Sequence, residues 1–95
     1  MLDDETRKKL IGRLRRIEGQ IAGIQRMVED DAYCVDVLVQ MSAAQGALAK
    51  AGHVLLGHHV GHCVSDAMRH GDEQERQIKI DELMDVLGRY GGLAR

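Results

Sequence analysis

The feature that most constrains this chain is the absence of proline from all 95 residues. Proline ends or kinks helices, so no residue here forces a helix to stop early. Phenylalanine and tryptophan are also absent, and the two tyrosines, Tyr33 and Tyr90, are the only large aromatic side chains. The other apolar residues suit helices packed on helices better than a β-sandwich. The composition therefore predicts an all-α fold.

The first predicted helix covers residues 4–29. Apolar side chains recur there at steps of four and three, as in a heptad seam. Asp3 or Asp4 is the expected cap at its start. Glu29, Asp30 and Asp31 interrupt the pattern at the end of this helix, and Asp30 or Asp31 is the expected N-cap of the next helix. The seam consists of Leu10, Leu14, Ile17, Ile21, Ile24 and Val28.

Two further helices are predicted, over residues 32–69 and 72–89, with Gly71 suited to a left-handed helix end between them. The middle of the longer helix, residues 42–52, is rich in small side chains, which predicts a surface where another helix approaches closely. Residues 1–95 contain no repeat or low-complexity stretch, so we expect one domain. A chain this small buries a limited core, and oligomerisation is therefore an expected source of stability.

Charge is distributed unevenly along the chain, whose net charge is −2. Between Thr6 and Met27 there are seven basic residues and one acidic residue, Glu18. A basic face of this kind indicates an anionic partner such as nucleic acid. The alternative is an ordinary solvated helix face. The basic residues are Arg7, Lys8, Lys9, Arg13, Arg15, Arg16 and Arg26.

The apolar segments and the cysteines indicate a compartment. No segment has the uninterrupted apolar length of a membrane span, and the N-terminus does not resemble a signal peptide. In a chain without a signal peptide, two cysteines with histidines between them are more often a metal or redox site than a structural disulfide. We therefore expect a cytoplasmic protein with no membrane partner.

Cys34, His59 and Cys63 share one narrow stripe of the predicted second helix. His59 and Cys63 are four residues apart, so both side chains can bind one ion. At ~100° per residue, His59 lies about 20° to one side of Cys34 and Cys63 about 20° to the other. Two thiolates and one imidazole form a soft, low-coordinate donor set that favours Cu(I), whereas Zn(II) or Ni(II) needs a fourth ligand.

These three residues cannot bind one ion within a single continuous helix, because Cys34 and His59 lie ~37 Å apart along it. They can meet if two chains pack antiparallel and cross near Ala47, so that Cys34 of one chain approaches His59 and Cys63 of the other. Two-fold symmetry then creates two equal sites. The alternative is that both cysteines are small apolar core residues. Cys–His catalysis is less favoured, because neither an orienting group nor a substrate pocket can be identified.

Three motifs occur in order along the chain: Arg13–Gln20 (RLRRIEGQ), Tyr33-Cys34 and His59–Val64 (HVGHCV). Together they resemble the copper-sensitive operon repressor family, CsoR, over nearly the whole chain. The resemblance implies three helices per chain, an antiparallel four-helix-bundle homodimer, and a dimer of dimers that binds DNA as a homotetramer without a helix-turn-helix. The same family includes nickel/cobalt, formaldehyde and persulfide sensors.

The resemblance also implies roles for particular residues. The copper branch of the family binds Cu(I) through residues that match Cys34, His59 and Cys63, with one ion per chain shared between two chains. The family's outer-shell tyrosine matches Tyr33, beside the first ligand, and its outer-shell glutamate matches Glu82. The basic residues expected to bind operator DNA are Arg13, Arg16 and Lys50, with the neighbouring Arg15 and Lys9.

The function implied is that of a Cu(I)-responsive repressor and not of an enzyme. Its metal-free tetramer binds operator DNA and is released when Cu(I) binds, so that copper-resistance or efflux genes are expressed. No small organic substrate is expected. The alternatives are a sensor of another inducer on the same fold (persulfide, nickel or cobalt, or formaldehyde) and a copper buffer without a DNA role.

Overall fold

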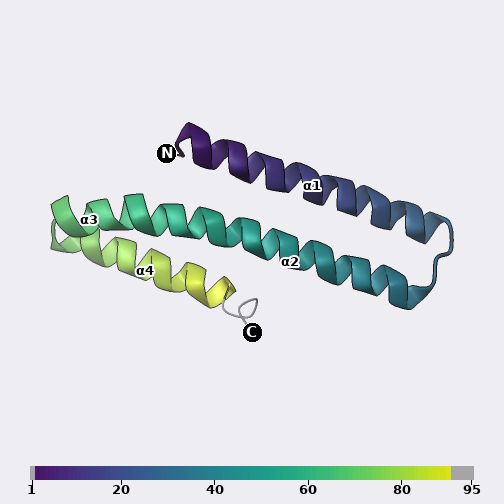
Figure 1. The fold of residues 1–95 in the computed structure, drawn as a ribbon. Coiled ribbons are helices and arrows are strands. Elements are labelled where there is room, and N and C mark those ends of the chain that lie inside the picture. Colours follow the sequence, from purple (N-terminus) through teal and green to yellow (C-terminus); the bar gives the residue numbers. More distant parts are fainter. Residues whose placement is uncertain (1, 91–95) are drawn as a thin grey trace. The chain divides into compact units, whose positions relative to one another are not determined.

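The computed structural model describes residues 2–90, and all regular structure among them is helical (Figure 1). The elements are α1 (Asp4–Glu29), α2 (Cys34–His58), the π-helical segment η1 (His59–Val64), α3 (Ser65–His70) and α4 (Glu73–Tyr90). Since α2, η1 and α3 follow one another without a break, these elements form three helices, as the sequence predicts. The all-α fold is confirmed. Within the described range, no helix has the length and apolar character that a membrane crossing requires.

The chain divides into two compact units, Met1–Leu55 and Leu56–Arg95. The first unit contains α1 and most of α2, and the second contains η1, α3 and α4. The single domain expected over residues 1–95 stays a prediction.

In the Met1–Leu55 unit, α1 begins where the sequence supplies a cap. The Asp3 carboxylate accepts a hydrogen bond from the Thr6 backbone N–H at 2.7 Å, which satisfies one of the unpaired donors of the first turn. Asp4 and Glu5 follow in that turn, where negative charge interacts favourably with the helix dipole. Local chemistry therefore accounts for this helix start.

The turn after α1 differs from the expectation. Asp31 adopts a left-handed conformation with φ 54°, its N–H donates to the Val28 carbonyl at 3.2 Å, and the Ala32 N–H donates to the Met27 carbonyl at 2.9 Å. These bonds form a Schellman motif that ends α1. The expectation that Asp30 or Asp31 caps the second helix was wrong, because both residues terminate the first one and α2 begins only at Cys34.

Few side chains of this unit are buried. On α1 only Ile17 is, at 5% exposure, and on α2 the buried residues are Val37, Ala44 and Ala51, at intervals of seven. In Figure 1, α1 and α2 run in opposite directions on either side of the short turn. Much of the predicted apolar seam is exposed in the single chain, namely Leu14, Ile21 and Val28.

In the Leu56–Arg95 unit, the chain passes from η1 through α3 into α4 by a sharp turn at Gly71. This residue has φ −79° and ψ 156°, so the expected left-handed helix end was wrong. Glycine is needed for a different reason: a Cβ at Gly71 would lie 2.6 Å from the Ala67 carbonyl oxygen. The Asp72 carboxylate then accepts a hydrogen bond from the Glu75 N–H at 2.8 Å and caps α4.

After this turn, α4 packs against both α3 and η1. Val64, the last residue of η1, is the buried apolar residue of this unit among those described. The apolar positions Ile80 and Leu87 of α4 stay exposed in the single chain, at 41% and 43%. The packing therefore positions α4 next to the π-helical segment without enclosing a large core.

Candidate metal centre and nucleic-acid interface

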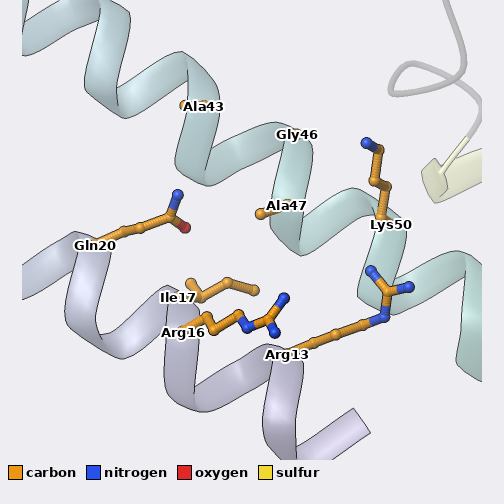
Figure 2. A pocket seen from close by; sticks show the side chains of 8 residues that line it. All are labelled: Arg13, Arg16, Ile17, Gln20, Ala43, Gly46, Ala47 and Lys50. Atoms are coloured by element: carbon orange, nitrogen blue, oxygen red, sulfur yellow. The ribbon is translucent and has the colours of Figure 1, made fainter. Parts of the chain in front are cut away.

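A basic groove lies between α1 and α2 in the Met1–Leu55 unit, with a volume of about 370 Å³. Ile17 lines it, and α2 borders it with the small residues Ala43, Gly46 and Ala47 (Figure 2). A Cβ at Gly46 would meet no atom within 4 Å. The small residues expected to allow close helix approach therefore leave this space opposite α1.

Cationic side chains surround the groove. Arg13 and Arg16 extend from α1 toward α2, and Lys50 lines the groove from α2 with its ammonium group directed away from the Arg13 guanidinium (Figure 2). Gln20 completes the lining, one turn beyond Arg16, and none of the lining residues is acidic. Guanidinium groups bind phosphate oxygens through paired hydrogen bonds, so this groove has the chemistry to bind a phosphate backbone.

The structure separates the five expected DNA-binding residues into two groups. Arg13, Arg16 and Lys50 line one groove, although Lys50 is far from the two arginines in sequence. Arg15 lies ~200° around α1 from Arg13 and does not line the groove, and Lys9 instead lies 4.0 Å from the Glu5 carboxylate. Gln20 was not expected, although its spacing of four from Arg16 places it on the same helix face.

Cys34, the first of the expected metal ligands, is the first residue of α2 and is exposed. It lines an open pocket of about 400 Å³ together with apolar residues, among them Val37 and Met41. Tyr33, the expected outer partner, immediately precedes it and is 69% exposed. His59 is 25 positions after Cys34 in the sequence, because Cys34 is the first residue of α2 and His59 is the first residue after its end.

The other two expected ligands, His59 and Cys63, belong to the π-helical segment η1. A π-helix forms i→i+5 hydrogen bonds and occurs mostly as single turns, frequently at functional sites. A uniform rotation of ~100° per residue would place Cys34, His59 and Cys63 on one stripe, but the rotation is smaller from His59 to Val64 because a π turn is wider. Cys63 is half-buried, and both cysteines are free thiols.

Glu82 of α4 contacts the His59 imidazole. Its Oε1 lies 3.3 Å from His59 Nε2, and the Lys79 ammonium lies 3.8 Å from the same oxygen. The His59 side chain is 26% exposed and that of Glu82 is 47% exposed. With Nε2 directed at the carboxylate, Nδ1 is the imidazole nitrogen left to bind another group. The pairing of His59 with Glu82 is thus present in the single chain.

The chain matches known proteins over most of its length. The family model described as metal-sensitive transcriptional repressor matches residues 6–89. The copper-sensing transcriptional repressor CsoR of Bacillus subtilis (strain 168) is 49% identical over 82 residues, which cover 86% of this chain and 78% of that protein. Transcriptional repression is a non-enzymatic role that acts on DNA.

Two solved structures share the fold. The copper-sensing repressor CsoR with Cu(I) from Geobacillus thermodenitrificans NG80-2 has a TM-score of 0.86 at 44% identity, covering 96% of this chain and 92% of that chain. The nickel-responsive transcriptional regulator InrS has a TM-score of 0.73 at 35% identity, covering 87% and 90%. Because the family model extends from the first turn of α1 to the last turn of α4, the chain belongs to the metal-sensitive transcriptional repressor family.

Proposed function

We propose that this chain is a Cu(I)-responsive transcriptional repressor that acts in the cytoplasm. The observation that carries the proposal is that one π-helical turn presents His59 and Cys63, with the His59 imidazole oriented by Glu82. Carboxylates that hold the second nitrogen of a histidine are typical of metal sites, where they orient the ring and raise its basicity. The 49% identity with a protein named as a copper-sensing repressor supports the choice of metal.

The donor set fits Cu(I). Both thiols are free, and thiolates are the ligands that select Cu(I) among the metals available to a cell. His59 adds one imidazole nitrogen, and Glu82 and Tyr33 are the proposed outer partners. When bound, Cu(I) supplies a link between thiolate and imidazole side chains from separate helices. Zn(II) or Ni(II) would need a further ligand to complete a coordination number of four.

Two chains share each site in this proposal. Cys34 begins α2 and His59 follows its end, so we propose that Cys34 of one chain joins His59 and Cys63 of an antiparallel partner. Many apolar side chains that a small monomer cannot cover are exposed, and this supports a homodimer that assembles further into a tetramer. Large examples on α1 and α2 are Ile21, Val28, Leu38, Val39 and Leu48, all about half exposed.

DNA binding is assigned to the basic groove. Arg13, Arg16 and Lys50 would contact backbone phosphates, which position a protein on the duplex and make its affinity depend on salt. In the metal-free tetramer these grooves are spaced so that they contact the phosphates of the operator together. Joining Cys34 to the partner's ligands changes how the two chains are held, so the grooves fit the duplex less well. Operator affinity then falls by a coupling free energy of typically ~1–3 kcal/mol, and DNA weakens metal binding equally.

The test is an operator titration under anaerobic, reducing conditions. A duplex that the metal-free protein selects from random-sequence DNA is labelled, and its affinity is measured by fluorescence anisotropy with and without one equivalent of Cu(I) per chain. We expect weaker binding with Cu(I), by a factor of about 5–150. An unchanged affinity at full copper occupancy would contradict the proposal.

The alternative on the same fold is a thiol sensor, in which Cys34 and the partner's Cys63 are modified or cross-linked. Both cysteines are free thiols, so both are available for modification. A His59→Ala variant separates the two functions: a copper sensor loses its response, whereas a thiol sensor keeps its response to persulfide.

A further inference from the structure

We propose that His58 and His62 form a second metal site, which binds a borderline divalent ion such as Zn(II). Their imidazole rings are stacked, with centroids 4.4 Å apart and planes inclined by 27°. A ring nitrogen of one histidine lies within 4.8 Å of a ring nitrogen of the other. The proposed copper ligands use neither residue, and this pair contains no sulfur.

The local backbone brings the two rings together. His58 is the last residue of α2, and His62 lies in the π-helical segment. Side chains four residues apart lie on one face of a helix. Because a π turn contains more residues than an α turn, residues four apart still lie on one face where the helix widens. His58 is half-buried and His62 is exposed, so an ion bound between them has access to solvent.

The nitrogen separation suits a four-coordinate ion. Zn–N bonds are ~2.0–2.1 Å long, so two imidazole nitrogens on a tetrahedral ion lie ~3.4 Å apart. Binding would therefore require the side-chain torsions to bring two nitrogens from within 4.8 Å to that distance. Two protein ligands leave positions for water, and we therefore expect weaker binding than at a site with three or four protein ligands.

Donor chemistry distinguishes this pair from its neighbours. His59 and Cys63 each follow one residue later, which places them roughly a quarter turn farther around the helix. The neighbouring pair includes a thiolate, which favours soft Cu(I), whereas two imidazoles favour Zn(II), Ni(II) or Cu(II). The same helical segment therefore offers two metal-binding faces with different selectivity.

Zn(II) titration of the full-length protein tests the proposal. The parent for this test is the variant Cys34→Ala/His59→Ala/Cys63→Ala, which lacks the proposed copper ligands. In competition with a chromophoric chelator, we expect this parent to bind one Zn(II) per chain and to lose that equivalent with His58→Ala or His62→Ala. The matched control is His53→Ala, which removes an exposed histidine from α2 and should leave the equivalent intact.

Two results would overturn the proposal: a parent that binds no Zn(II), and His58→Ala and His62→Ala variants that titrate like the parent. Circular dichroism establishes that each variant is folded. A second measurement uses the unmodified chain and therefore does not depend on the folding of any variant. Co(II) added after Cu(I) loading should give ligand-field absorption without a thiolate charge-transfer band, and a thiolate band would contradict an all-imidazole site. Because these readouts do not involve DNA, their failure is distinguishable from failure of the copper-sensing proposal.

Discussion

The two units hold their functional side chains by different means. In Met1–Leu55, the helices α1 and α2 are regular, and the groove exists because small α2 residues leave space beside the cationic side chains of α1. In Leu56–Arg95, the backbone departs from the α-helix where His59 and Cys63 lie, and α4 contributes Glu82 to one of them. A groove made of several independent cations should weaken gradually under substitution. A site that needs a particular turn and, as proposed, ligands from a partner chain should lose metal binding with a single substitution.

The largest effect is expected from Cys63→Ala. This variant should keep its metal-free DNA affinity but lose the whole Cu(I)-dependent change, about 5–150-fold, because one thiolate ligand is gone. Anisotropy titrations with and without Cu(I) measure both quantities. Ser65→Ala, two residues later, is the matched control and should respond as the unmodified chain does. If Cu(I) still releases DNA from the Cys63→Ala variant, Cys63 is not a ligand that the response requires.

Charge reversal in the groove should have the next largest effect. Arg13→Glu should weaken DNA binding by tenfold or more and reduce the slope of log affinity against log salt by about one for each lost phosphate contact. Arg15→Glu makes the same change of charge on the same helix but outside the groove, so its loss should be clearly smaller. Equal losses would mean that general positive charge, and not the groove, binds the DNA.

Glu82→Gln tests the outer contact in the other unit. The amide cannot accept as strongly from the His59 imidazole, so we expect Cu(I) affinity to fall about 10–100-fold with unchanged stoichiometry. Competition with a chromophoric Cu(I) chelator measures this. Asp81→Asn removes a neighbouring charge that contacts Gln77 instead and should have little effect. If both variants behave alike, the contact with His59 contributes nothing specific.

Gly71→Ala is expected to act on the stability of the fold and not on metal or DNA binding. The added Cβ would lie 2.6 Å from the Ala67 carbonyl oxygen and 3.0 Å from the Glu75 carboxylate, and such overpacking destabilises by roughly 1–3 kcal/mol. Gly88→Ala in α4 meets no atom within 4 Å and should stabilise the fold by about 1 kcal/mol through helix propensity. Urea unfolding compares them, and equal free energies of unfolding would show that the turn at Gly71 is not tightly packed.

The same contrast between the units explains what could be predicted from the sequence. The start of α1 and its basic face follow from local spacing, because Asp3 is within reach of the Thr6 N–H and side chains four apart share a helix face. Such features depend on residues close in sequence. The presence of Arg13 and Lys50 in one groove depends on how α2 packs beside α1, and composition alone did not predict it.

The features that the sequence did not predict depend on backbone conformations that several sequences can adopt. Asp31 takes a left-handed conformation to end α1, although aspartate is equally typical of an N-cap. Nothing in the residues from His59 to Val64 distinguishes a π turn from an α turn, since both are helical and differ by one residue in hydrogen-bond spacing. The resemblance to a family predicted Glu82, and residue spacing did not.

The central claim is that each copper site belongs to two chains, and subunit complementation tests it most directly. Cys34→Ala chains and His59→Ala/Cys63→Ala chains, carrying different tags, are co-expressed, and dimers that carry both tags are purified under conditions in which the proposed tetramer is dissociated. Each parent dimer should bind no Cu(I) at the site, whereas the mixed dimer should regain one Cu(I) per dimer, because Cys34 of one chain then meets intact His59 and Cys63 of the other. A mixed dimer that binds no Cu(I) would contradict the shared site.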